Sequence, residues 1–436
     1  MMADPVVVKF KKNNQTNENS IFCLKLNVPN QFINMKVLCP LMILQSVFFS
    51  GFGQSDINRI DSLMKSWYQP TAPGAVIAIE LHHNIIFKKG YGLADINTQK
   101  PITADDNFNI GSLTKQFTAY ALLDLFYKGK FSLDDSIGKF FKLPDPLSGI
   151  RISQLLSHSS GIPDHYNLTD TNKVKHATDK DVLTALKIAD SLYFISGTHY
   201  RYSNTAYCLL GLLIEKLSGM SYAAYLQQEI FGPLEIRDAT VFKINQSIPR
   251  RVIGYDFEKN EKFVRSDAEE SIFFSTEADG GIYISMNNYM KWCEAIETGK
   301  FSKSKMIHYS WQGHTYVGSR QGLWYGCGWF IQQANDKISP EIIYHTGFNG
   351  GFRTVVLLIP SQEYCISIFS NRSDIDLENL VSKINKILSV DDNSFIKSGP
   401  LESFIHSWPI FVPCKETRSF STSFKKNLNA KDMVLN

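Results

Sequence analysis

The stretch NIGSLTKQF, residues 109–117, decides how the rest of the chain is interpreted. Ser112 and Lys115 are three residues apart, so on a helix that begins near Ser112 both side chains project from one face. A serine hydroxyl becomes a good nucleophile when a base removes its proton, and lysine is such a base once burial or a neighbouring cation lowers its pKa. The spacing alone fits a capping serine beside a solvated lysine equally well. Serines with the same S-x-x-K spacing also stand at five other positions: Ser62, Ser136, Ser302, Ser394 and Ser423.

Hydrophobic periodicity predicts one sheet assembled from both ends of the chain, with a mostly helical insertion at about 130–270. Helical spacing marks residues 56–68, 112–127, 181–189, 205–217 and 377–388, the last as a closing helix on the sheet. Strand signals mark residues 74–81, 85–90, 282–284, 328–332, 341–344, 354–359 and 364–369. The fold class is therefore α/β in the broad α+β sense, with residues 55–390 forming one domain.

Composition and missing motifs exclude several classes of protein. A net charge of +3 is too small to imply nucleic acid as a partner. The seven cysteines form no C-x-x-C pair, which argues against a zinc site or a disulfide framework. His82 and His83 lack the spacing or acidic partners of a metal pair, and H-E-x-x-H is absent, so no histidine motif indicates a metal site. G-x-S-x-G is absent too, which excludes an α/β-hydrolase, and Gly326 and Gly328 are too few glycines for a dinucleotide loop.

Residues 35–53, MKVLCPLMILQSVFFSGFG, have the layout of an export signal, with Lys36 ahead of an apolar stretch and small residues before a cut near Gly53. The stretch is short for a span of about 20 apolar residues, and Pro40 interrupts it. We expect translation to begin at Met35, with residues 1–34 an uncertain extension. An internal anchor or a buried element is the alternative. Residues 391–436 are expected to form a basic, solvated tail.

Two further motifs change the interpretation of Ser112 and Lys115. Tyr202-Ser203-Asn204 lies where a polar loop enters an apolar helix, so the tyrosine can relay a proton and the asparagine can hold a lysine or a substrate amide. His345-Thr346-Gly347 follows an apolar strand, and its glycine lets a substrate lie close to the strand edge. Each motif alone has a purely structural explanation, either as a loop or as a strand that ends in a turn.

Together and in this order, the three motifs resemble those of the serine β-lactamases and penicillin-binding proteins: S-x-x-K, then Y-x-N, then K/H-T-G. The tyrosine is similar to that of the class C β-lactamases and their related D,D-peptidases and esterases. The resemblance covers about 60–390 and implies an antiparallel sheet flanked by helices, with no cofactor or metal. Three flanking segments also resemble this family: QLLSHSSGIPDH at 154–165, DGGIYISMNNYMKW at 279–292 and YGCGWFI at 325–331.

The resemblance also implies roles for individual residues. Ser112 becomes acylated, while Lys115 and Tyr202 share the work of the base and then protonate the leaving group. Asn204 orients Lys115 and the substrate. The backbone N–H groups of Ser112 and Phe348 form the oxyanion hole. The motif His345-Thr346-Gly347 lines the substrate site, and Tyr202 activates the water that releases the acyl group.

One departure from the family pattern bears on the substrate. His345 stands where true β-lactamases commonly have lysine, so less fixed positive charge faces a substrate carboxylate, and Arg353 is a candidate to supply it. We therefore expect a D,D-peptidase, peptidase or carboxylesterase with at most weak β-lactamase activity, acting on a small molecule or peptide. Its expected location is the periplasm or exterior of a bacterium, with no membrane span once the signal is cut. The alternative is an inactive module that binds peptidoglycan fragments or a protein, although the polar positions of all three motifs are filled.

Overall fold

The computed structural model describes residues 53–169, 175–258, 262–266, 272–300, 304–317, 322–334 and 341–389. The predicted extension at 1–34, almost all of the predicted export signal at 35–53 and the predicted tail at 391–436 lie outside these residues. No helix in the described part of the chain is both long and apolar enough to cross a membrane.

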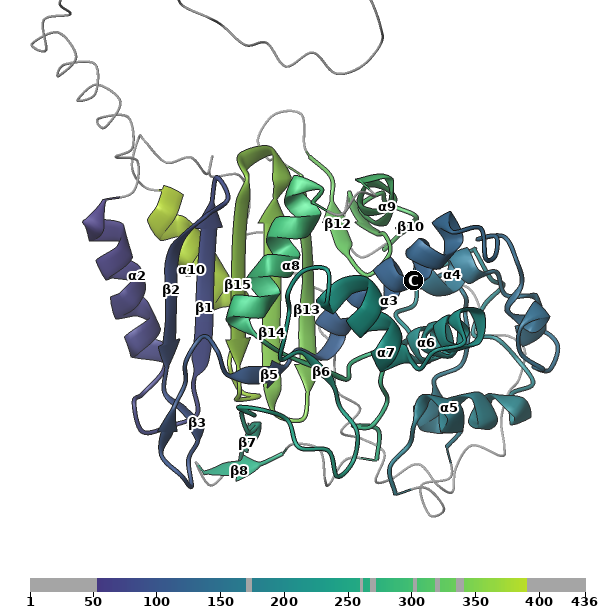
Figure 1. The fold of residues 1–436 in the computed structure, drawn as a ribbon, viewed down its shortest axis with the longest axis horizontal. Coiled ribbons are helices and arrows are strands. Elements are labelled where there is room, and N and C mark those ends of the chain that lie inside the picture. Colours follow the sequence, from purple (N-terminus) through teal and green to yellow (C-terminus); the bar gives the residue numbers. More distant parts are fainter. Residues whose placement is uncertain are drawn as a thin grey trace, which may run out of the picture. The chain divides into compact units, whose positions relative to one another are not determined.

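An antiparallel sheet of eight described strands forms the centre of the domain, in the order β10-β11-β12-β13-β14-β15-β1-β2 (Figure 1). Strand β1, from the start of the domain, pairs along its whole length with β15, from its end. This pairing confirms the prediction of one sheet built from distant parts of the chain. The strands are β1 Ala75–Leu81, β2 Asn84–Tyr91, β10 Thr315–Tyr316, β11 Leu323–Tyr325, β12 Phe330–Gln332, β13 Ile342–Asn349, β14 Phe352–Ile359 and β15 Tyr364–Ser370.

The central strands are covered on both faces, which explains their nearly continuous apolar sequences. In β1 the side chains of Ile77 and Ile79 belong to one core cluster, and those of Val76 and Ala78 belong to the other. Successive side chains of a strand point to opposite faces, so the sheet separates two cores. Glu80 lies on the same face as Val76 and Ala78.

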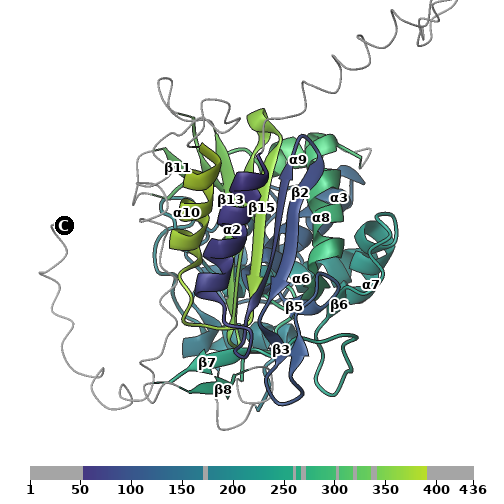
Figure 2. The same cartoon turned by 90° about the vertical axis from the view of Figure 1, so that its left-hand side faces the viewer.

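Helices α2 Gln54–Trp67 and α10 Leu377–Ser389 cover one face of the sheet, as Figure 2 shows. Both were predicted from their helical spacing. Helix α8 Met286–Thr298 lies on the other face against β1 and β15, and its spacing was not recognised in the sequence. The side chain of Ser285 caps α8 by accepting a hydrogen bond from the Asn288 backbone at 3.3 Å, which explains why the helix begins directly after a strand.

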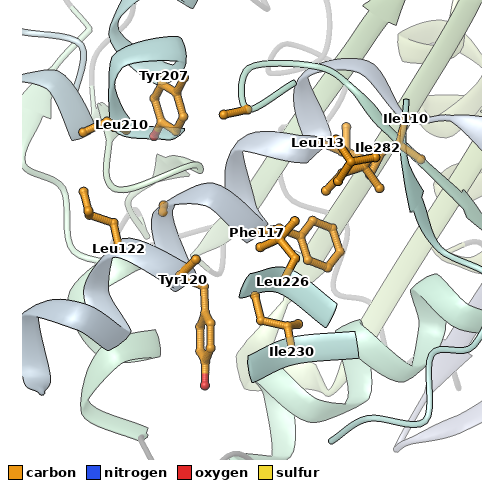
Figure 3. Packing of buried hydrophobic residues seen from close by; sticks show 14 of the residues in the cluster. Ile110, Leu113, Phe117, Tyr120, Leu122, Tyr207, Leu210, Leu226, Ile230 and Ile282 are labelled. Atoms are coloured by element: carbon orange, nitrogen blue, oxygen red, sulfur yellow. The ribbon is translucent and has the colours of Figure 1, made fainter. Parts of the chain in front are cut away.

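Helix α3 Thr114–Tyr127 lies inside the second core and is buried on all sides over most of its length (Figure 3). The Phe117 ring packs 4.5 Å from the Trp292 ring of α8 and 5.7 Å from the Phe231 ring, measured between centroids. Helix α6 Asn204–Ser218 packs beside α3, within the predicted helical insertion. The shorter helices are α4 Ile152–Leu156, α5 Asp179–Ala185, α7 Tyr222–Leu226 and α9 Ser304–Ser310.

Within the described residues, three small sheets supplement the large one. Strand β9 Ile282–Ser285 had been predicted within the main sheet, but it pairs instead with β5 Asn107–Asn109 and β6 Thr240–Val241. The prediction was wrong because short apolar strands give no indication of their partners. The remaining small strands are β3 Leu93–Asp95 with β4 Lys100–Pro101, and β7 Tyr255–Phe257 with β8 Phe263–Arg265.

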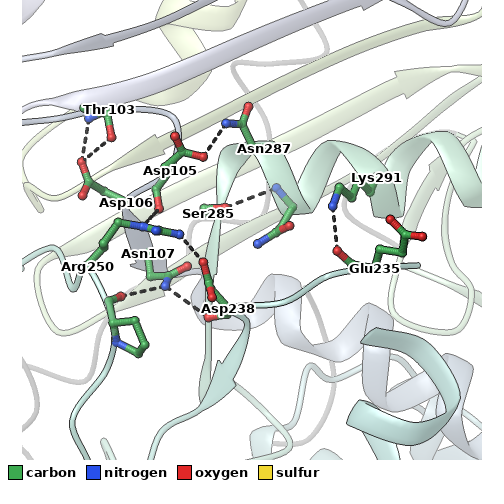
Figure 4. A network of polar contacts seen from close by, with 12 residues as sticks. Thr103, Asp105, Asp106, Asn107, Glu235, Asp238, Arg250, Ser285, Asn287 and Lys291 are labelled. Carbon is green, nitrogen blue, oxygen red and sulfur yellow. Dashed lines mark hydrogen bonds and ion pairs between the residues drawn. The ribbon is translucent and has the colours of Figure 1, made fainter. Parts of the chain in front are cut away.

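A polar network fixes β5, the strand that leads to Ser112 (Figure 4). The Asn107 amide donates to the carbonyl oxygens of Pro249 at 2.8 Å and Asp238 at 3.2 Å. Arg250 donates to the Asp105 carbonyl at 2.8 Å and pairs with the Asp238 carboxylate. The contacts of Asn107 and Asp105 join segments more than a hundred residues apart, so they hold the chain just before the predicted nucleophile.

Candidate active site

Ser112 lies in a 3₁₀ turn, η1 Gly111–Leu113, that immediately precedes α3. The sequence had predicted that the α-helix begins at Ser112, but the α-helix begins two residues later, at Thr114. The Asn109 side chain accepts a hydrogen bond from the Gly111 backbone at 2.8 Å, and Gly111 has a φ of 52°. A Cβ atom on Gly111 would lie 2.8 Å from the backbone nitrogen of Phe348. Glycine is required at this position, because both the backbone conformation and the close approach exclude a side chain.

Strand β13 carries the His345-Thr346-Gly347 motif against this turn. The motif had been expected just after a strand, but β13 continues through it to Asn349. A Cβ on Gly347 would lie 2.2 Å from the Ile110 carbonyl oxygen, so glycine lets the strand and the turn meet. Thr354 of β14 donates its hydroxyl to the same carbonyl at 2.8 Å. Ser112 and the predicted substrate strand are thus neighbours.

Lys115 has no exposed surface, and its ammonium nitrogen has three close polar neighbours. Nζ lies 3.1 Å from Ser112 Oγ, 2.8 Å from Asn204 Oδ1 and 2.7 Å from the Asp279 carbonyl oxygen. Burial lowers the pKa of Lys115 to about 8, although the charge of Asp279 opposes the shift. At pH 7 about one tenth of such a lysine is neutral.

The same three contacts suit the neutral amine. The amide oxygen of Asn204 and the carbonyl oxygen of Asp279 can only accept, so they take two N–H groups. The lone pair of the neutral Nζ then faces the Ser112 hydroxyl, which can donate its proton to the amine. The geometry therefore allows direct proton transfer from serine to lysine.

Asn204 is held in place by the beginning of α6. Ser203 is the N-cap residue and accepts a hydrogen bond from the Ala206 backbone at 3.1 Å. The Asn204 amide nitrogen donates to the Tyr166 hydroxyl at 2.9 Å, so its oxygen is the atom that faces Lys115. Both functional groups of the amide are engaged, which fixes the orientation of the side chain.

Tyr202 stands beside the same two residues. Its ring centroid lies 4.9 Å from Lys115 Nζ. Burial raises the pKa of the Tyr202 hydroxyl above its ordinary value, although a hydrogen bond with Ser112 acts in the opposite direction. The His158 ring packs 4.2 Å from the Tyr202 ring, and its Nδ1 accepts a hydrogen bond from the Ser203 backbone at 3.2 Å. Tyr202 is thus a neutral phenol, able to donate a proton near Ser112.

His345 is buried and neutral. Burial lowers its pKa to about 3, and the neighbouring charge of Lys115 adds to the shift. Nδ1 lies 2.7 Å from the Thr346 carbonyl oxygen, which can only accept, so Nδ1 carries the proton. Nε2 then accepts from the Tyr325 hydroxyl at 3.1 Å. The imidazole therefore offers no positive charge to a substrate.

The structure does not bring Arg353 together with Ser112. In β14, Thr354 faces the serine turn, and Arg353 points to the opposite face of the sheet. The Arg353 Nε donates to the Ser373 carbonyl at 2.8 Å, and the guanidinium lies 4.7 Å from the centre of the Phe348 ring. Phe348 itself reaches the site through its backbone, which lies against Gly111.

Two contacts of this site were not recognised in the sequence. The Asp279 carbonyl binds Lys115, and Tyr166 fixes Asn204. The glycine pair that follows Asp279 was the only signal for a backbone contact of this kind. Nothing in the sequence around Tyr166 indicates its role, because the contact depends on tertiary folding.

The sequence and the fold are similar to those of known proteins that form one family. The sequence model described as Beta-lactamase matches residues 58–381, most of the chain. Protein flp of Staphylococcus aureus (strain MW2) is 28% identical over 335 residues, which are 75% of this chain and 66% of that relative. The chain thus spans slightly less than two thirds of the length of that relative.

Penicillin-binding protein 4* of Bacillus subtilis (strain 168) is 28% identical over 325 residues, 71% of this chain and 70% of that protein. The octameric penicillin-binding protein homologue from Pyrococcus abyssi superposes with a TM-score of 0.63 at 25% identity, covering 73% of this chain and 74% of the homologue. The chain therefore belongs to the beta-lactamase family, and it has the β-lactamase/transpeptidase-like fold.

Proposed function

We propose that the protein cleaves an amide or ester bond of a small molecule or peptide through an acyl-enzyme at Ser112. One observation carries the proposal. The buried Lys115 has two N–H groups assigned to oxygens that only accept, and its third position faces Ser112 Oγ at 3.1 Å. A solvated lysine beside a capping serine would show none of these features.

The proposed reaction begins when neutral Lys115 accepts the Ser112 proton while Oγ attacks the carbonyl carbon. The backbone N–H groups of Ser112 and Phe348 stabilise the oxyanion of the tetrahedral intermediate. The C–N or C–O bond then breaks, and the leaving group takes a proton from the Lys115–Tyr202 pair. Water held by the Tyr202 hydroxyl then attacks the acyl carbonyl while its proton passes through Tyr202 to neutral Lys115. Lys115 gives that proton to Ser112 Oγ as the acyl group leaves, which restores the free hydroxyl. Every proton is returned, and no cofactor is consumed.

The neutral His345 restricts the substrate. A cationic lysine in the third motif would attract a carboxylate, whereas the imidazole here uses both ring nitrogens within the protein. Arg353, which was predicted as a substitute, faces the other side of the sheet. We therefore propose a peptidase or carboxylesterase whose substrate needs no carboxylate beside β13, with slow turnover of penicillins.

The proposed place of action is outside the cytoplasm. Residues 35–53 have the composition of a cleaved export signal, and this remains a prediction from the sequence. Such a location would suit an enzyme that acts on cell-wall peptides or on secreted esters.

Intact-protein mass spectrometry tests the proposal after incubation with a penicillin and, separately, with a small activated ester. Ser112→Ala is the test variant. Ser62→Ala is the matched control, because Ser62 belongs to another S-x-x-K copy and lies exposed on α2. We expect acylation or ester turnover in the wild type and in Ser62→Ala, and neither in Ser112→Ala.

The two reagents also distinguish substrate classes. A stable penicillin adduct would favour a D,D-peptidase, whereas fast ester turnover without an adduct would favour an esterase or a peptidase. If the folded wild type neither acylates nor turns over either reagent, the proposal fails and an inactive binding module becomes the better explanation.

A further inference from the structure

A glutamate occupies a core position near the end of β1. The face of β1 that carries Val76 and Ala78 is apolar and packs against α8, but its next residue is Glu80, which is only 3% exposed. Across the sheet Glu80 pairs with Cys365, which is also buried. A carboxylate in this position costs free energy unless a counter-charge or hydrogen bonds compensate for its burial.

A second carboxylate, from α8, reaches the same place. Glu297 lies in the last turn of that helix, and its side chain is 4% exposed. Neither of its carboxylate oxygens has a hydrogen-bond partner among the described residues, and the same holds for Glu80 Oε1. Two buried acids with unpaired oxygens therefore lie within 4.8 Å of each other, and pairs of this kind need a compensating partner.

His83 closes the cluster from the turn between β1 and β2. Its Nδ1 lies 3.8 Å from Glu80 Oε1 and 3.8 Å from Glu297 Oε2. One potential ligand atom from each of these three residues lies within 4.8 Å of the other two. Glu363 stands outside them, with a carboxylate oxygen 3.9 Å from His83 Nε2. His83 was predicted to lack acidic partners, and that prediction was wrong: they are present, one of them three residues earlier in the chain.

We propose that Glu80, His83 and Glu297 bind a divalent transition-metal ion, with Zn²⁺ and Mn²⁺ as the candidates. Carboxylate oxygens and imidazole nitrogens are the donors these ions take. Bond lengths of about 2.0–2.2 Å require ligand atoms roughly 3–4 Å apart, so a small inward movement of the three side chains completes the site. The ion would supply the positive charge that the buried pair lacks.

A proton is the competing explanation for the buried pair. Burial, together with Glu80 and Glu363, raises the pKa of Glu297 to about 8, so a protonated Glu297 would also relieve the repulsion. The two explanations differ in one measurable respect: only the first requires a bound metal ion.

The proposed metal site is separate from the hydrolase site. Following the register, Glu80 lies in the same row of the sheet as Ile343, whereas Gly347 lies in the row of Val76. Four residues along the strands and three strands across place the two regions roughly 20 Å apart. The metal should therefore act on stability, and the chemistry at Ser112 should not need it.

The test uses the full chain after treatment with a chelator, titrated with Mn²⁺ while free Mn²⁺ is followed by electron paramagnetic resonance. A parallel titration with Zn²⁺ uses competition against a chromophoric chelator. The variants are Glu80→Gln and Glu297→Gln, which keep side-chain size and remove the charge. Glu294→Gln is the matched control, because Glu294 lies on the same helix but pairs with Lys300 at the surface.

We expect one binding event per chain that both Glu80→Gln and Glu297→Gln weaken at least about tenfold, the lower limit for loss of a group that supports a metal. Glu294→Gln should bind like the wild type. Unchanged circular dichroism and ester hydrolysis would show that the variants are folded. The proposal is overturned if the wild type binds neither ion, or if binding is the same in all four proteins.

Discussion

Two clusters of ionisable groups lie on the same face of the central sheet, and they differ in how their buried polar atoms are paired. The Lys115 nitrogen has a polar neighbour for each of its three hydrogens, whereas both carboxylate oxygens of Glu297 lack a hydrogen bond to any described residue. A satisfied buried charge is held ready for chemistry, because its position is fixed before substrate arrives. An unsatisfied one needs compensation, and for Glu80 and Glu297 we have proposed a metal ion as the compensating partner.

The largest expected difference between the clusters is in catalysis. Lys115→Met removes the base while keeping the length of the side chain, and we expect kcat to fall about 10³–10⁴-fold. Lys65→Met is the control, because Lys65 belongs to another S-x-x-K copy and pairs with Asp61 at the surface. Steady-state ester hydrolysis is the measurement. If Lys115→Met kept wild-type activity, Lys115 would not be the catalytic base, and the paired cluster would have no role in catalysis.

A smaller effect is expected for Tyr202→Phe. The ring keeps its packing against His158, but the hydroxyl, which interacts with Ser112, is lost. We expect kcat to fall about 10²-fold, the contribution of one proton-transfer group. Tyr193→Phe, which changes an exposed tyrosine, should leave kcat unchanged. Equal rates for the wild type and Tyr202→Phe would assign all proton transfer to Lys115.

The pH dependence of kcat/KM tests whether Lys115 acts as the base. Burial lowers the pKa of Lys115 to about 8, and only the neutral amine can accept the serine proton. As pH falls below about 8 the ammonium form accumulates, so kcat/KM should decrease about tenfold per pH unit. It should level off above that pH. A profile that is flat between pH 6 and 9 would contradict lysine as the base.

The smallest effect concerns the support of Asn204. Ser203→Ala removes the cap of α6, and we expect the free energy of unfolding to fall by about 1 kcal/mol. Ser221→Ala removes the corresponding cap of α7 and should cost the same stability. Because Asn204 follows directly after Ser203, we expect only Ser203→Ala to lower kcat, by a few fold. Denaturant titration and turnover measured together separate the two effects, and equal kcat values in the two variants would show that the cap does not position Asn204.

The sequence predicted elements with strong periodicity and failed where tertiary contacts decide. The strands β1, β2, β14 and β15 and the helices α2, α6 and α10 were predicted within a few residues of their observed bounds. The predicted end of strand β13 was too early, because the polar residues and the glycine in its second half are not typical of a strand. Its partner β14 keeps it extended to Asn349.

The candidate site shows the same division. The order of the three motifs predicted the group around Ser112, Lys115, Tyr202 and Asn204. The Asp279 carbonyl lies 164 residues from Lys115 and is a backbone group, so no side-chain pattern indicates it. Glu80 and Glu297 are likewise distant in sequence and meet only because α8 packs against β1. Successive residues of a strand point to opposite faces, so Arg353 and Thr354 had to point to different faces of the sheet. The sequence did not show that Thr354 is the one that faces the serine turn.

The central claim is that Lys115 is a buried amine with a lowered pKa. The most direct test is nuclear magnetic resonance of the protein with ¹³C-labelled lysine, titrated with pH, where the signal missing in Lys115→Met identifies Lys115. We predict a titration midpoint near 8, well separated from those of the surface lysines. A midpoint at the ordinary value of about 10.4 would contradict the account, because the amine would then carry its proton throughout the working range of the enzyme.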